Sequence, residues 1–117
     1  MGQYYHIVNL DKREYLHPHK FGDGLKLLEF GDSGGGTMTG LAILLANSNG
    51  RGGGDLHSEN PIIGSWAGDR IVIAGDYAEH GDAGELKKTQ AATTWGNNLF
   101  QRCDSGEFDD ISGKVIQ

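Results

Sequence analysis

Glycine restricts what this chain can fold into more than any other residue. It occurs 20 times in 117 residues, over twice its usual share of about 7%. Glycine loses more backbone freedom on folding than other residues, so a glycine cluster is usually a disordered tether or a loop that approaches something closely. There are two clusters, GDSGGGT at residues 31–37 and SNGRGGGDLH at residues 48–57. Apolar segments flank both, which favours ordered loops.

The length of the chain predicts one globular domain over residues 1–117, because 117 residues support a single hydrophobic core. The one cysteine, Cys103, excludes an internal disulfide and is typical of a reducing compartment, so we expect a cytoplasmic protein. We expect Cys103 to pack at a helix end rather than act as a nucleophile. No apolar run approaches the roughly 18 residues of a membrane span, so no membrane partner is predicted.

The charge balance indicates the kind of partner. The chain has 16 acidic and 10 basic residues, a net charge of −6 with neither sign gathered into a long block. A phosphate backbone would be repelled on average, so we predict no nucleic-acid binding. A basic partner surface is favoured. The alternative is that the charge serves only to keep a small protein in solution.

The N-terminal segment predicts a β-hairpin. Residues 3–10 and 13–16 are rich in aromatic and β-branched side chains, and Asp11-Lys12 between them forms the turn. Both faces of the first strand carry apolar side chains, so we expect the strand to be covered on both sides.

Two helices are predicted next. Residues 21–31 favour a short helix with Asp23 as its N-cap and leucines on its buried face. Residues 37–47 have helical length and leucines at core spacing, with Gly50 as the terminator. A buried strand at 41–46 remains an alternative, because that run is apolar on all sides.

The central segment predicts a second hairpin. Residues 62–67 and 70–74 flank Gly68-Asp69, and glycine at the first of two turn positions is typical of a type II′ turn. The continuous apolar run at 71–74 indicates a central strand covered on both faces.

The C-terminal third predicts two further elements. A capping-box pattern at 82–85 precedes a helix at 86–95, and the tail indicates a short extended piece followed by a helical turn capped by Asp110 or Ser112. The predicted fold class is therefore α+β, with a mostly antiparallel sheet built from the N-terminal and central hairpins and packed by two to three helices.

The dipeptide Gly-Asp recurs along the chain. We interpret it as turn chemistry, because glycine supplies positive φ and aspartate bonds nearby backbone or caps a helix. Calcium binding is the sharper alternative, but the EF-hand spacing and the Gly-Gly-x-Gly-x-Asp repeat are missing. The dipeptide ends at Asp23, Asp32, Asp55, Asp69, Asp76 and Asp82.

The glycine clusters carry the main functional question. The first has threonine where a Walker loop needs lysine, and neither fits Gly-x-Gly-x-x-Gly, so no cofactor is predicted. Consecutive glycine amides before a helix can instead bind an anion, and an arginine can add a bidentate contact. The alternative is a structural loop in which Arg51 pairs with Asp55. The candidate ligand-binding residues are Asn49, Arg51, Gly52, Gly53, Gly54, Gly35, Gly36, Thr37 and the aromatic Trp66.

The histidines raise the question of metal binding and catalysis. His17 and His19 could join Asp55 and His57 in a zinc set, but nothing in the spacing brings them together, so we expect exposed histidines and predict no metal site. For acid–base chemistry the candidates are His57 and Asp55, beside the predicted anion site at Arg51.

The segments MGQYY, NLDKREYL, FGDGLKLLEF, NGRGGGD and GSWAGDRIVIAGDYA resemble those of small uncharacterised bacterial and phage proteins that begin Met-Gly-Gln-Tyr-Tyr. The resemblance covers roughly the first two-thirds of the chain and a tail segment at 110–115. It implies a microbial or viral setting and a single domain, and it carries no activity.

Two functions follow as hypotheses. The first is a small binding or interaction protein that recognises a protein partner or a small anionic ligand through its glycine loops. A homo-oligomer is one form that this hypothesis includes. The second is a small enzyme acting on a phosphorylated or nucleotide-like substrate, with Arg51 holding the anion and His57 moving a proton. The first is preferred, because no catalytic pair is fixed by spacing.

Overall fold

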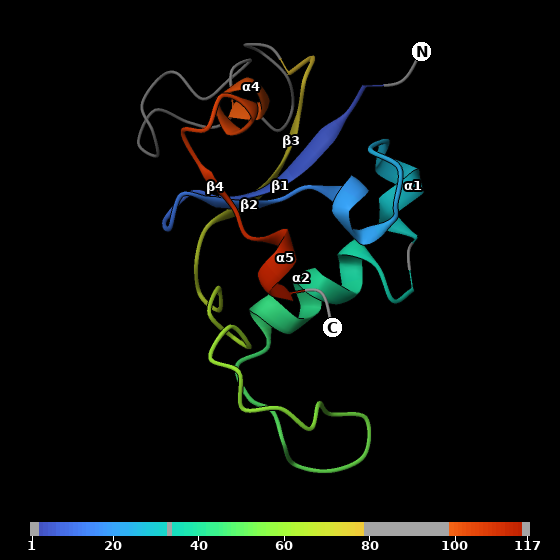
Figure 1. Cartoon of the computed structure of the whole chain (residues 1–117), viewed down its shortest axis with the longest axis vertical. Coiled ribbons are helices and arrows are strands. Elements are labelled where there is room, and N and C mark those ends of the chain that lie inside the picture. The colour runs from blue at the N-terminus through green and yellow to red at the C-terminus, as the bar shows by residue number, and fades with distance from the viewer. Residues whose placement is uncertain (1–2, 33, 79–98, 116–117) are drawn as a thin grey trace.

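The computed structural model describes residues 3–32, 34–78 and 99–115. In this part of the chain four strands form one sheet in the order β3-β1-β2-β4 (Figure 1). β1 pairs antiparallel with both β2 and β3, and β4 pairs parallel with β2. This confirms an α+β fold with a mostly antiparallel sheet, and it confirms the N-terminal hairpin. The strands are β1 (Tyr5–Asn9), β2 (Glu14–Leu16), β3 (Ile71–Gly75) and β4 (Asp109–Asp110).

Short helices pack on this sheet. The predicted helix at 37–47 is confirmed as α2, which ends at Leu45, so the strand alternative is excluded and Gly50 is not its terminator. The extended piece and final helical turn of the tail are also confirmed, and the Asp110 carboxylate accepts the Ser112 amide at 2.9 Å. The predicted helix at 86–95 lies outside the described residues. The helices are η1 (Pro18–Phe21), α1 (Leu27–Gly31), α2 (Thr37–Leu45), α4 (Leu99–Asp104) and α5 (Ser112–Val115).

The core lies on both faces of the sheet, as the two apolar faces of the first strand predict. Val8 on one face packs with residues of α4, including Cys103. Ile7 on the other face packs with α2 and α5 residues, including Leu44. Figure 1 shows α4 on one side of the sheet and α2 with α5 on the other. Among the described residues, no helix has the length and apolar character needed to cross a membrane.

The predicted central hairpin is wrong in its first half. Residues 61–68 form consecutive turns, and β3 pairs with β1 instead. The cause lies at the end of α2, whose last carbonyls have no partner within the helix. The amides of Gly64 and Trp66 donate to the Ile43 and Leu44 carbonyls, each at 2.9 Å, so this segment completes α2 rather than a sheet.

The place of β3 in the sheet is also a correction. β3 borders β1 alone in the described sheet and lies at its end, so it is not the central, doubly covered strand that its apolar sequence predicts. Ile73 is 39% exposed as a result.

The helix predicted at 21–31 begins later, at Leu27, and Asp23 is not its N-cap. The Glu29 carboxylate accepts the Lys26 amide at 3.1 Å at the start of α1 instead. Of the leucines predicted to share a helical face, Leu28 is 84% exposed, whereas Phe30 of the same helix is fully buried. Asp23 caps a different helix, α2, as described below.

Candidate functional site

The first glycine cluster lies at the N-terminus of α2 and already holds a carboxylate. Asp23 Oδ2 accepts hydrogen bonds from the Thr37 amide at 2.8 Å and the Thr37 hydroxyl at 2.6 Å. A Cβ on Gly36 would lie 2.5 Å from the same oxygen, so glycine is needed for the close approach. The Gly35 amide donates to Thr39 Oγ1 at 2.8 Å. The anion predicted at this helix end is thus an aspartate of the chain itself.

The second cluster is an ordered loop that closes on itself. Asp55 Oδ2 accepts the Arg51 amide at 2.8 Å, and the Asp55 amide donates to the Gly52 carbonyl at 3.1 Å. Asn49 bridges the base of the loop, since its Oδ1 accepts the Leu56 amide at 2.9 Å and its Nδ2 donates to the Ser58 carbonyl at 3.3 Å. Positive φ explains the alternate glycines of the cluster: Gly50, Gly52 and Gly54 have φ of 83°, 135° and 92°.

The remaining predicted residues of this loop point to solvent. Arg51, Gly53, Asp55 and His57 are all exposed. Arg51 contacts Asp55 through its backbone amide, whereas the pairing considered above was one between the two side chains. The binding of an external anion by Arg51, and a catalytic role for His57, stay predictions.

Trp66 is a core residue. Its side chain has no exposed surface, and its indole Nε1 donates to Glu14 Oε1 at 2.8 Å. We therefore leave Trp66 out of the candidate site.

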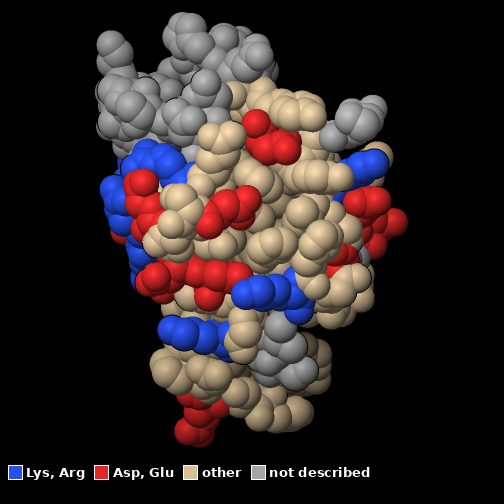
Figure 2. All heavy atoms as spheres, turned by 45° about the horizontal axis from the view of Figure 1, so that its top comes forward, with Lys and Arg blue, Asp and Glu red and all other residues tan. Residues whose placement is uncertain are grey.

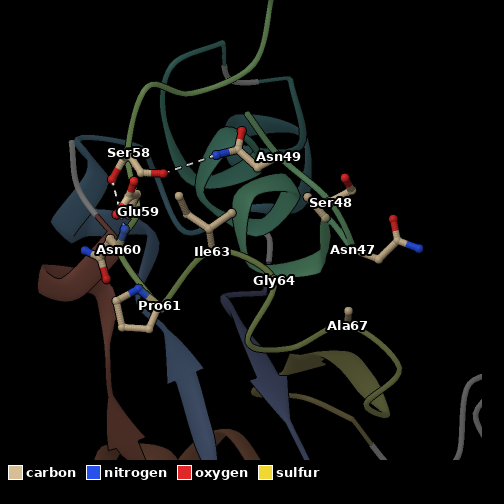
Figure 3. Close-up of a pocket in the computed structure, with 11 residues that line it drawn as sticks. Asn47, Ser48, Asn49, Ser58, Glu59, Asn60, Pro61, Ile63, Gly64 and Ala67 are labelled. Atoms are coloured by element: carbon tan, nitrogen blue, oxygen red, sulfur yellow. Dashed lines mark hydrogen bonds between the residues drawn. The ribbon is translucent and has the colours of Figure 1, made fainter. Parts of the chain in front are cut away.

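A polar hollow of about 450 Å³ lies beside the glycine loop (Figure 3). One wall follows the end of α2 at residues 46–49, the other wall is the segment 58–61, and Ile63 and Gly64 lie between them. Its volume falls in the usual range for small-ligand sites, about 300–1,000 Å³. Of the predicted site residues, Asn49 lines this hollow, whereas Arg51 and the glycines of the loop do not.

The hollow offers several hydrogen-bonding groups that the fold does not use. Asn49 is committed to the loop, and Asn60 Oδ1 accepts the Ile62 amide at 3.0 Å. The side chains of Asn47, Ser48 and Glu59 make no hydrogen bond or ion pair with any described residue. Among the described residues that line the hollow there is no lysine or arginine, and Glu59 is the one charged side chain.

Two short polar segments of the sequence are a signal for this hollow. The triplets Asn47-Ser48-Asn49 and Ser58-Glu59-Asn60 flank the glycine loop on either side. Because the loop closes on itself, its two flanks come together and form the two walls. Two polar triplets around a closing loop therefore indicate a polar site.

A row of three histidines, His6, His17 and His19, is a second polar cluster. His19 is exposed as predicted, whereas His17 is half-buried and His6 is fully buried. The His6 ring has no exposed surface, and its centroid lies 4.7 Å from that of the half-buried His17. The His17 and His19 rings lie 5.4 Å apart, as their spacing suggested. His6 also stacks on Phe100 of α4 at 4.0 Å. The alternation of β1 could place His6 on a face but could not show what covers that face.

Burial sets the protonation of this row. His6 Nε2 lies 2.8 Å from Asp104 Oδ1, and since a carboxylate only accepts, the histidine nitrogen donates. Burial lowers the pKa of His6 against the opposing pull of Asp104. It lowers the pKa of His17 too, with help from the neighbouring His6. Both rings are therefore held neutral, with their Nδ1 atoms buried and without a hydrogen-bond partner in the described part of the chain.

Other polar residues have structural positions. Cys103 is buried in α4 and packs in the core, which confirms the predicted packing role, and burial raises the pKa of its thiol to about 12. In residues 3–32, 34–78 and 99–115, no three His, Cys, Asp or Glu side chains gather as a metal site would require. Among the described Gly-Asp carboxylates, Asp55 serves a turn and Asp23 a cap, as predicted. Asp69 and Asp76 instead form long-range contacts, since Asp76 Oδ1 accepts the Tyr4 amide at 2.9 Å and Asp69 Oδ2 accepts from Asn9 at 2.8 Å.

Acidic and basic side chains are interspersed on the face of the molecule shown in Figure 2. On this face, a charged ligand is therefore selected by the charges that line its own binding site rather than by a large surface of one sign. No family model matches this chain, and neither a curated protein nor a solved structure matches it.

Proposed function

We propose that this protein is a small interaction module, and that its polar hollow receives a positively charged side chain of a partner protein. One observation carries the proposal: in the part of the chain that the structure describes, the hollow is lined by one carboxylate without a partner and by amide and hydroxyl groups, with no lysine or arginine.

The charge of the hollow favours a cation. Glu59 is exposed at the wall of the hollow, so an ion pair with it gains a modest energy, as surface ion pairs do. The net charge of −6 adds a weaker long-range attraction for basic partners. An anionic ligand in this hollow would meet Glu59 without a compensating cation. The proposal therefore differs from the small anionic ligand that the glycine clusters suggested.

The hydrogen-bonding groups favour arginine over lysine as the guest. A guanidinium carries five donors in a flat fork and matches a carboxylate bidentately. The Glu59 carboxylate and the side-chain oxygens of Asn47 and Ser48 supply acceptors on both walls. The glycine loop then has a supporting role, because its closure through Asn49 holds the two walls at a fixed separation.

The test uses a matched pair of probes. N-acetyl-arginine amide and N-acetyl-citrulline amide have almost the same shape, and only the first is charged. In a titration followed by amide NMR, the arginine probe should shift resonances of residues 47–49 and 58–60. It should bind about fivefold more tightly than the citrulline probe, which corresponds to about 1 kcal/mol for a partly exposed charged pair.

Two variants locate the effect. Glu59→Gln should remove the preference for arginine. Asp109→Asn, which neutralises an exposed carboxylate on β4, should keep it. Equal binding of both probes to the unaltered protein, or equal losses in the two variants, would contradict the proposal.

A further inference from the structure

A second hollow of about 460 Å³ lies on the other side of the segment 60–61. It shares Asn60 and Pro61 with the polar hollow but has different chemistry. Two lysines line it, Lys12 from the turn between β1 and β2 and Lys114 from α5. We call it the lysine hollow.

A buried hydroxyl in the wall of the lysine hollow has no partner. Ser65 Oγ is buried, and no described residue forms a hydrogen bond with it. The Ser65 amide is satisfied, since it donates to the Ile62 carbonyl at 3.0 Å. Buried hydroxyls are almost always hydrogen-bonded, because burying a hydroxyl without a hydrogen-bond partner is unfavourable. Because Ser65 is one of the residues that line the hollow, a guest bound there is a candidate partner for this hydroxyl, which a rotation of the Ser65 side chain would bring to it.

The charges of the lysine hollow favour a singly charged anion. The Lys12 ammonium lies 2.5 Å from Asp69 Oδ2, so its charge is largely compensated. Lys114 is exposed and pairs with no described acidic residue. Glu14 also lines the hollow, where its Oε1 accepts the Trp66 indole, and its charge opposes a dianion. Pro61 and Ile62 add an apolar surface.

We propose that the lysine hollow binds the carboxylate of a small ligand that also carries an apolar group. Lys114 supplies the positive charge and Ser65 the neutral donor, while the apolar part lies on Pro61 and Ile62. The charged groups of this site differ from that of the polar hollow, since Glu59 does not line it, although the two hollows share Asn60 and Pro61.

The test is an amide NMR titration of the whole chain with benzoate, and with benzamide as the neutral isostere. Benzoate should shift the resonances of Ile62, Ser65 and Lys114 in a saturable way and should bind at least about fivefold more tightly than benzamide, as expected for a charge-assisted contact. Lys114→Gln and Ser65→Ala should each weaken benzoate binding by about the same factor. Lys26→Gln, which removes an exposed lysine of another surface, should leave it unchanged.

A stability measurement separates a binding role of Ser65 from a structural one. An unpartnered hydroxyl contributes nothing to the fold, so Ser65→Ala should melt at the same temperature as the unaltered protein or higher. A melting temperature several degrees lower would show that the hydroxyl has a structural partner, and would overturn the assignment. Benzoate shifts confined to residues 50–55, or equal binding of benzamide, would do the same.

Discussion

The two glycine clusters each contain four glycines, a serine and an aspartate, but they have very different surroundings. Gly36 is buried at the start of α2, pressed against the Asp23 carboxylate. Residues 50–54 are exposed in a loop that Asp55 and Asn49 close. In both clusters a backbone amide next to a glycine donates to an aspartate of the same chain: the Thr37 amide to Asp23 and the Arg51 amide to Asp55. Burial is what differs, and it should decide how much each cluster contributes to stability.

The sharpest way to break this comparison is to add one methyl group to each cluster. Gly36→Ala places a Cβ 2.5 Å from Asp23 Oδ2, so it should lower the free energy of unfolding by about 3 kcal/mol. Gly53→Ala meets nothing within 4 Å at a position without positive φ, and should be neutral or stabilise by up to about 1 kcal/mol. Urea denaturation measures both. Similar losses in the two variants would remove the distinction.

Removing the carboxylate that each cluster binds, Asp23 or Asp55, tests the same contrast between the buried and the exposed cluster. Asp23→Ala takes away the acceptor for two hydrogen bonds at a buried helix start and should lower the free energy of unfolding by about 2 kcal/mol. Asp55→Ala takes away one exposed contact and should lower it by about 0.5 kcal/mol or less. A larger loss for Asp55→Ala in the same denaturation assay would show that the exposed loop supports the fold.

Burial should govern pH dependence in the same way. The pKa of His6 lies below that of an unfolded histidine, so below pH 6.5 the unfolded chain takes up protons first. The free energy of unfolding therefore has its full value above about pH 6.5 and falls as the pH drops below it. The fall is at most about 1.4 kcal/mol per pH unit for each histidine whose pKa is lowered by burial. Denaturation between pH 7 and 5.5 measures the slope. His57→Gln, at an exposed site, should preserve it. A flat profile would contradict the buried neutral state.

The last expected effect concerns the base of the exposed loop. Asn49→Ala removes three hydrogen bonds that join the two flanks of the loop, and should lower the free energy of unfolding by about 1 kcal/mol. Hydrogen exchange of the Leu56 amide should also become faster. Asn47→Ala, on the same wall of the polar hollow, should change neither quantity. Unchanged exchange at Leu56 in Asn49→Ala would mean that the loop closes by other contacts.

Local signals predicted the parts of the fold that depend on neighbouring residues. The N-terminal hairpin, α2 and the helical turn after Asp110 all follow from short patterns of apolar, turn and capping residues. The central hairpin was wrong because a distant element intervened: Gly64 and Trp66 bond to the end of α2. Asp23 was likewise assigned to the nearest helix although it caps a helix 14 residues away.

The site was less predictable than the fold. Asn49 was a candidate from the sequence and does line the polar hollow, but Glu59 and Asn60 on the opposite wall were not considered. Their position depends on loop closure, which no local pattern specifies. The burial of His6 depends in the same way on α4, which lies about 95 residues further along the chain and supplies Phe100 and Asp104.

The parallel pairing of β2 with β4 has a consequence for biosynthesis. Tyr15 pairs early with Val8 of β1, but its β4 neighbour is present only when Asp110 has been made. α5 must follow before the core on the α2 side of the sheet is complete. A nascent chain stalled before residue 109 would leave one margin of β2 and the apolar side of α2 open to water. Chaperones that bind such surfaces should therefore associate with the ribosome-bound chain until its tail emerges.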